Sequence, residues 1–158
     1  MKTSQLMAVG LIVGVVLGLP TGSAAVECVV TGAKNDAIVK VIQEMMDNFN
    51  SRNTAQIEKD WHPDVVTTRK EHDDPARDHK GKGYPHERHW NGEYKDGKVS
   101  NCILQFVKSD RMETNVIAEY DFTTNGKCKK NHIMANMMFR EKKLYRASFE
   151  PKPKRQDC

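Results

Sequence analysis

The chain has 158 residues, of which 38% are hydrophobic and 29% are charged, and its formal net charge is +4. This length is enough for one domain with a substantial core. Acidic and basic residues nearly balance, and the basic ones do not gather into one long cluster. The composition therefore gives no support to nucleic-acid binding, which needs basic residues concentrated on one face.

The first 25 residues have the layout of a secretory signal peptide. Lys2 provides a positive charge, the stretch from Leu6 to Leu19 has no charged residue, and small residues at 23–25 provide a cleavage site. The apolar stretch is shorter than the about 20 residues that a membrane-spanning helix needs. We therefore expect cleavage after residue 25 and a soluble, extracellular chain of one domain over residues 26–158. An uncleaved N-terminal anchor is the alternative.

Four cysteines lie in the mature chain, and an even number in an oxidising compartment predicts two disulfides. They are Cys28, Cys102, Cys128 and Cys158. None belongs to a C-x-x-C pair, so we expect neither a zinc site nor a thioredoxin-like redox pair. The mature chain also has no N-glycosylation sequon.

An amphipathic helix is predicted over residues 35–50. Apolar residues recur there at the i, i+3, i+4, i+7 spacing of one helix face, and Asn35 or Thr31 can cap the start. The residues of this face are Ile38, Val41, Ile42, Met45 and Phe49.

A second, shorter helix is expected to follow. Asn53 and Gln56 resemble a capping box, Ile57 and Trp61 fall on one side, and Pro63 should end the helix. The apolar and β-branched residues at 65–68 then predict a short strand.

Residues 69–98 carry many charges of both signs and almost no apolar side chains. We expect a long exposed excursion with a hairpin near Gly83 to Gly92. A structureless segment of this length is uncommon in a compact domain unless it is functional or mobile. Histidines and aspartates in it invite a metal hypothesis: His72, His79, His86, His89, Asp73, Asp74 and Asp78. A metal site needs several ligands on a rigid frame, so we favour a solvated loop of mixed charge without a metal.

The C-terminal part predicts a meander of four antiparallel strands, at 102–108, 113–123, 132–140 and 144–150, followed by a basic tail. Asn125-Gly126 is a strong hairpin turn. If Thr124 pairs with Lys129 across it, three pairs share the face that the helices cover: Tyr120 with Ile133, Ala118 with Ala135, and Val116 with Met137. The opposite face then carries Ile117, Met134, Asn136 and Met138, and it is only partly polar.

The strand directions also bear on the disulfides. The hairpin turn places Cys128 at one end of the sheet, and the last strand runs back toward that end. This predicts the pairs Cys128–Cys158 and Cys28–Cys102. Cys102 begins its strand at the same end, so it remains a rival partner for either terminus.

Residues 34–151 together resemble the nuclear transport factor 2-like superfamily, which includes ketosteroid isomerase, polyketide cyclases and many non-catalytic domains. The resemblance is carried by the helix at 37–50, the Arg52-Asn53-Thr54 link, the Trp61-His62-Pro63-Asp64 helix exit and the strands of 103–149. It implies an α+β roll in which a curved antiparallel sheet wraps N-terminal helices in a cone and leaves a cavity. The signal peptide and cysteines resemble small secreted animal members, including nematode ones.

Enzymes of this superfamily place a catalytic Asp, His or Tyr in the cavity. The main candidates here are Asp64 and Tyr120, and His62 and His132 are weaker candidates. Asp64 matches a position where non-enzymes also have an aspartate, Tyr120 could equally be a core tyrosine, and His132 is predicted to point outward. No carboxylate falls on the predicted inner face of the two middle strands, where general acid–base catalysis would need one.

We therefore predict a secreted, non-catalytic domain that binds a small apolar ligand or a protein partner, without a cofactor. The predicted cavity residues are Trp61, Tyr120, Ile133 and Met137. The predicted interface for a homodimer or partner is formed by Ile117, Met134 and Met138. An isomerase, cyclase or hydrolase that uses the cavity, and a self-assembling structural domain, are the alternatives.

Overall fold

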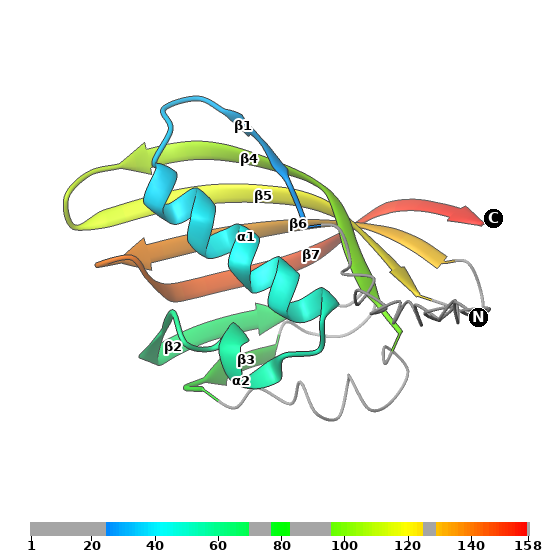
Figure 1. Cartoon of the computed structure of the whole chain (residues 1–158), viewed down its shortest axis with the longest axis horizontal. Coiled ribbons are helices and arrows are strands. Elements are labelled where there is room, and N and C mark those ends of the chain that lie inside the picture. The colour runs from blue at the N-terminus through cyan, green and yellow to red at the C-terminus, as the bar shows by residue number, and fades with distance from the viewer. Residues whose placement is uncertain (1–24, 70–76, 83–95, 125–128, 158) are drawn as a thin grey trace, which may run out of the picture.

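A computed structural model describes residues 25–69, 77–82, 96–124 and 129–157. They form a curved, open, seven-stranded sheet with two helices on one face (Figure 1). The strand order is β1-β4-β5-β6-β7-β2-β3. The elements are β1 (Cys28–Thr31), α1 (Asp36–Asn50), α2 (Thr54–Ile57), β2 (Trp61–Arg69), β3 (Arg77–Lys80), β4 (Lys98–Ser109), β5 (Glu113–Thr124), β6 (Lys129–Arg140) and β7 (Lys143–Asp157).

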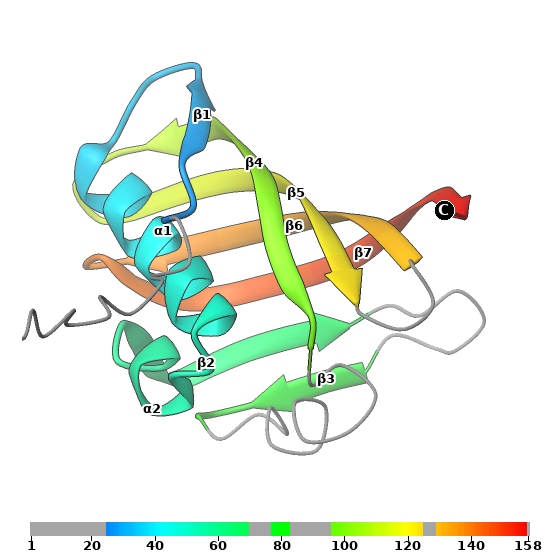
Figure 2. The same cartoon turned by 45° about the vertical axis from the view of Figure 1, so that its right-hand side comes forward.

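Helix α1 has the predicted position, but its buried face is turned from the predicted one, because Val39 and Met46 are buried in place of three of the predicted residues. The side chain of Asn35 caps its start by accepting the backbone N–H of Ile38 at 3.3 Å. The helix buries Ile38, Val39, Ile42 and Met46, while Val41, Met45 and Phe49 pack against this core from its rim. The helix runs obliquely across one face of the sheet (Figure 2).

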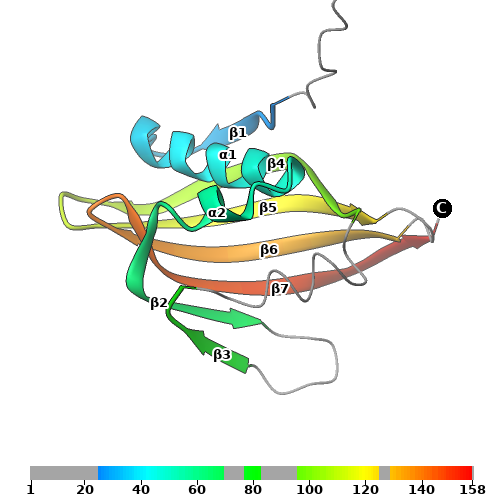
Figure 3. The same cartoon turned by 60° about the horizontal axis from the view of Figure 1, so that its bottom comes forward.

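The C-terminal end of α1 is tied to strand β4. The Asn50 side chain donates to the carbonyl oxygen of Val99 at 2.9 Å and accepts the N–H of Val99 at 2.7 Å. Arg52, just beyond the helix, donates to the carbonyl oxygen of Gly97. Viewed along the sheet, both helices lie on the same side, and the other side of the central strands is left uncovered by them (Figure 3). We call these two sides the helix face and the outer face.

The predicted meander is confirmed as strands β4 to β7, joined as antiparallel neighbours. The predicted register across β5 and β6 is also confirmed, because Thr124 pairs with Lys129, Tyr120 with Ile133 and Val116 with Met137. The residues that share this helix face are mostly buried, among them Val116, Ala118, Ala135, Met137 and Phe139.

The prediction of a wholly antiparallel sheet is wrong at both sides of the meander. β1 pairs with β4 in parallel, and β2 pairs with β7 in parallel, so the sheet is mixed. Parallel neighbours must be joined by a long crossover. Both pairs meet this condition, since the segment from α1 to β3 lies between β1 and β4, and the segment from β3 to β6 lies between β2 and β7.

The second helix is shorter than predicted. It ends at Ile57. Trp61 and Pro63 belong instead to β2, which begins at Trp61 and ends at Arg69. Asn53 stands at the N-cap position without a side-chain capping bond. Burial explains the change, because Ile57 and Trp61 both enter the core although only one of them is helical.

Two segments that are predicted to be irregular, the excursion at 69–98 and the basic C-terminal tail, each contribute residues to a β-strand. Arg77–Lys80 forms β3, antiparallel to β2, inside the predicted excursion. The predicted basic tail continues β7 to Asp157, which pairs with Lys129. Backbone hydrogen bonds hold such polar strands, so their side-chain pattern gave no signal. The predicted hairpin at residues 83–92 lies outside the described residues.

The predicted disulfide between Cys28 and Cys102 is confirmed. It joins β1 to β4 at two residues that are also direct partners in the parallel ladder. Gly32 follows β1 with a φ of +82°, and a Cβ there would approach the carbonyl oxygen of Phe106 at 3.2 Å. Glycine therefore permits both the left-handed turn and the close approach to β4. Cys128 and Cys158 lie outside the described residues.

Candidate ligand-binding site on the outer face of the sheet

The four predicted cavity residues lie on the helix face. Trp61 and Met137 are core residues with exposed fractions of 3% and 5%. Tyr120 and Ile133 are half-buried and pair directly across β5 and β6, and Tyr120 packs against the core. Three of these side chains, those of Trp61, Met137 and Tyr120, therefore belong to or pack against the core.

The two candidate catalytic residues lie apart. Asp64 is in β2 with 85% of its side chain exposed, and its backbone N–H donates to His62 Nδ1 at 3.1 Å. Tyr120 is in β5, and strands β6 and β7 separate β5 from β2. The His62 ring packs edge-on against Tyr145, with 5.3 Å between ring centroids.

His132 points to the outer face, where it lies between two carboxylates. Its Nε2 is 3.0 Å from Glu119 Oε2, and its Nδ1 is 3.2 Å from Asp121 Oδ1. Asp121 also accepts the side-chain N–H of Asn101 at 2.7 Å. This polar network links β4, β5 and β6. No group of three or more His, Cys, Asp or Glu residues within the described part of the chain is arranged to hold a metal ion.

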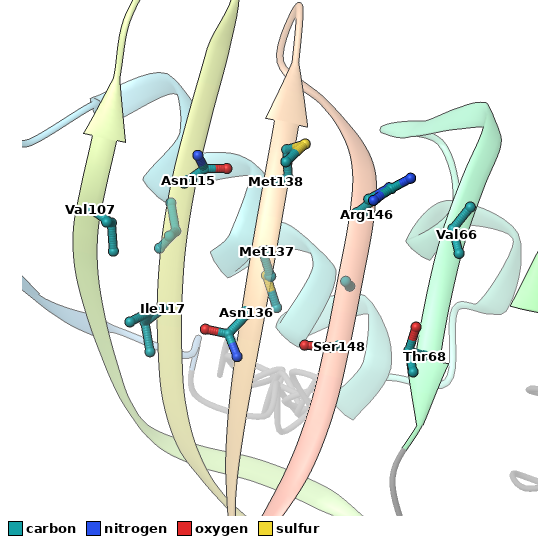
Figure 4. Close-up of a pocket in the computed structure, with 12 residues that line it drawn as sticks. Val66, Thr68, Val107, Asn115, Ile117, Asn136, Met137, Met138, Arg146 and Ser148 are labelled. Carbon is teal, nitrogen blue, oxygen red and sulfur yellow. The ribbon is translucent and has the colours of Figure 1, made fainter. Parts of the chain in front are cut away.

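A pocket of about 600 Å³ lies on the outer face, across β4, β5, β6, β7 and β2 (Figure 4). Two rows of cross-strand neighbours build it. The first row is Asn115, Met138, Arg146 and Val66, and the second is Ile117, Asn136, Ser148 and Thr68. Val107 closes the β4 side, at an irregularity in the β4–β5 pairing. Val116, Met137 and Ala147 are buried residues that complete the floor.

The lining combines apolar side chains with amides, hydroxyls and one guanidinium. Val66, Val107, Ile117 and Met138 supply the apolar part, and Arg146 is the charged group. Among the described residues, this lining includes no carboxylate, imidazole, thiol or phenol. The site has the chemistry to bind a molecule, but its lining holds no side chain that could act as a general base at neutral pH.

Two of the predicted interface residues, Ile117 and Met138, line this pocket, and Met134 lies in the next row between Glu119 and Glu150. The prediction missed Arg146 and Ser148 of β7 and the β2 residues. The alternation in β7 could have indicated Arg146 and Ser148. Ala147 and Phe149 are apolar and turn to the helix face, so Arg146 and Ser148 turn to the outer face. The position of β2 beside β7 has no comparable local signal.

No family profile matches the sequence, and no curated protein is found as a relative. Solved structures with the same fold are found. The Orange Carotenoid Protein of Anabaena (Nostoc) sp. PCC 7120, described as binding canthaxanthin, superposes with a TM-score of 0.61 at 14% identity over 80% of this chain and 39% of its own. The chain thus spans about two fifths of that protein.

Two further structures match over most of their length. A nuclear transport factor 2-like protein of unknown function from Burkholderia xenovorans LB400 has a TM-score of 0.58 and 12% identity, with coverage of 80% of this chain and 91% of that one. The hexachlorocyclohexane dehydrochlorinase LinA-type3 of Novosphingobium barchaimii LL02 has a TM-score of 0.58 and 13% identity, with coverage of 78% and 88%. The fold of this chain is therefore the nuclear transport factor 2-like α+β cone. In the described part of the chain, no helix has the length and apolarity to span a membrane.

Proposed function

We propose that this chain is a secreted, non-catalytic binding domain that holds a small and largely apolar ligand in the outer-face pocket. The pocket's volume of about 600 Å³ is within the range of about 300–1,000 Å³ that small-molecule sites occupy. Such sites combine a mostly apolar lining with a few polar groups that fix orientation. The pocket has both components.

The observation that carries the proposal is the composition of the lining. Hydrolysis, isomerisation and elimination need a group that moves a proton within hydrogen-bond reach of the substrate. The described lining offers hydroxyls, amides and a guanidinium, and none of these side-chain types is an ordinary general base. Binding needs none of these groups to titrate.

The fold is compatible with this role and with its main alternative. The printed description of the Anabaena protein names a bound canthaxanthin, whereas the Novosphingobium protein is a dehydrochlorinase. An enzymatic role for this chain would depend on the helix face instead, where Tyr120 is half-buried. Asp64 would have to leave its exposed position to join it.

Self-association through the outer face is a second candidate, favoured by apolar side chains left in solvent. Val29, Ile103 and Val107 have exposed fractions of 64%, 45% and 63%, and Val29 pairs with Ile103. An isolated exposed apolar residue is ordinary, but a contiguous group indicates an interface. Substituting Met134→Glu and Met138→Glu together should then convert a dimer into a folded monomer in analytical ultracentrifugation.

Binding is tested with Nile red, an uncharged apolar dye whose fluorescence rises when it leaves water. We expect the wild-type protein to bind it and Met138→Glu to weaken binding by about tenfold or more, because the new carboxylate lies beside its cross-strand neighbour Arg146 and replaces apolar lining with a hydrated ion pair. Gln105→Glu is the matched control, since Gln105 is exposed in β4 and does not line the pocket. Equal binding by the wild type and Met138→Glu would contradict the proposal.

A further inference from the structure

Arg146 lines the outer-face pocket from β7 and has no partner among the described residues. It lies in β7 between Met138 of β6 and Val66 of β2, its direct cross-strand neighbours. Its side chain is exposed and makes no hydrogen bond or ion pair with any described residue. In Figure 4 the Arg146 side chain extends from β7 toward β2.

Two other basic residues near this surface have carboxylate partners, and Lys80, the β3 neighbour of Val66, does not line the pocket. Lys108 lies in β4, at the end of the row that contains Arg146, and its Nζ is 3.1 Å from Asp110 Oδ2. Arg140 lies at the end of β6, and its Nε is 3.6 Å from Glu113 Oε2. Among the described lining residues, Arg146 is the charged group that a ligand in the pocket would meet.

The charges of the outer face change sign along the strands. The row that contains Arg146 is followed by the neutral row of Ile117, Asn136 and Ser148, and then by a row with Glu119 and Glu150. Arg146 and Glu150 are four residues apart in β7, which corresponds to about 13 Å along an extended strand. An anion in the pocket is thus favoured at Arg146 and disfavoured at the opposite edge.

Donors and apolar surface flank the guanidinium. Ser148 follows Arg146 on the same face and contributes a hydroxyl, while Met138 and Val66 lie on either side. Farther across the sheet, Ile117 and Val107 extend the apolar surface. The guanidinium offers a planar fork of N–H donors that matches a carboxylate in bidentate geometry.

We infer that the pocket binds a small amphiphilic monocarboxylate. The carboxylate pairs with the guanidinium of Arg146 and accepts from the Ser148 hydroxyl, and the aliphatic tail lies over Met138, Ile117 and Val107. The inference rests on the proposed function, since it names the chemical class of ligand for that site. It adds to the small and largely apolar ligand one negative charge at a defined end.

The test compares decanoate with decan-1-ol, which has the same chain without the charge. Binding is followed through the ¹³C-methyl resonance of Met138, for wild-type protein and for Arg146→Gln, Arg146→Lys and the control Arg140→Gln. Wild type should prefer decanoate to decanol by about tenfold or more, because a charged hydrogen-bonded pair is lost with the alcohol. Arg146→Gln should remove this preference while leaving decanol binding within about twofold. Arg146→Lys should retain part of it, and Arg140→Gln should retain all of it.

Equal affinity of the wild type for decanoate and decanol would overturn the inference, and so would an unchanged preference in Arg146→Gln. Absence of binding by both probes would overturn it as well. The proposed function is judged separately by Nile red, which carries no charge. Dye binding that depends on Met138, together with no preference for decanoate, would leave the binding domain standing and remove only the carboxylate. Thermal unfolding of each variant confirms that the exposed substitutions leave the fold intact.

Discussion

Removing the disulfide between β1 and β4 should lower the free energy of unfolding by about 4 kcal/mol. Cys28 and Cys102 are 74 residues apart in the sequence. A cross-link that closes a loop of this length reduces the entropy of the unfolded chain by an amount worth about 4.4 kcal/mol at 25 °C in the chain-entropy estimate. The double substitution Cys28→Ala with Cys102→Ala removes the link and leaves Cys128 and Cys158 in place.

The measurement is equilibrium unfolding in urea without a reducing agent, followed by circular dichroism. The midpoint should fall, and the slope m should rise because the unlinked unfolded chain exposes more surface. Val30→Ala is the matched control, since Val30 is a half-buried residue of β1 and its truncation removes packing but keeps the link. We expect it to cost about 1 kcal/mol.

Two results would refute this reasoning. If the double variant lost no more stability than Val30→Ala, the cross-link would contribute little and β1 would be held by its packing. If stability fell by about 4 kcal/mol with no change in m, the loss would come from the folded state instead of the unfolded chain.

Three further predictions concern the core, a turn and the chain termini. Ile42→Ala removes a side chain with an exposed fraction of 0% and should cost about 2–5 kcal/mol in urea unfolding; a change below about 1 kcal/mol would contradict the packing of α1. Asp110 accepts the backbone N–H of Glu113, which together with a lysine and a second N–H lowers the pKa of Asp110 to about 2. The charged form of Asp110 therefore stabilises the fold at pH values above the ordinary pKa of an aspartate, and this contribution is lost as the pH falls toward 2. Asp110→Asn should be less stable than wild type at pH 6 and equally stable near pH 2. A stability difference that does not change with pH would contradict a stabilising role for the Asp110 charge. Secreted protein should begin after residue 25 and should yield a Cys128–Cys158 peptide without reduction, since Asp157 and Lys129 are paired; retention of the first 25 residues or two free thiols would count against these predictions.

The sequence was sufficient to predict the parts of the fold that rest on local patterns. The apolar spacing in α1 and the Asn35 cap are signals within a few residues, so the helix bounds agree closely with the structure. The Asn-Gly turn and the alternation in β5 and β6 fixed the register, because a shift by one residue would turn the apolar face to solvent.

The missing parts depend on contacts between distant segments. β1 and β3 have four residues each and form the two edges of the sheet, and such short strands leave little pattern in the sequence. The parallel pairing of β2 with β7 cannot be read from either strand alone, yet it brings Val66 and Thr68 to the pocket. The sequence therefore predicts a site on the helix face, where apolar alternation is strongest. The pocket described above lies on the outer face instead.

Methionine methyl resonances measure directly on which face of the sheet a ligand binds. Met138 lines the outer-face pocket, whereas Met46 lies in α1 with an exposed fraction of 6% and reports on the core beneath the helix. During titration with Nile red, a ¹³C-methyl spectrum should show a saturable shift of Met138 with Met46 unmoved. A saturable shift of Met46 with Met138 unmoved would place the ligand between helix and sheet and contradict the outer-face site.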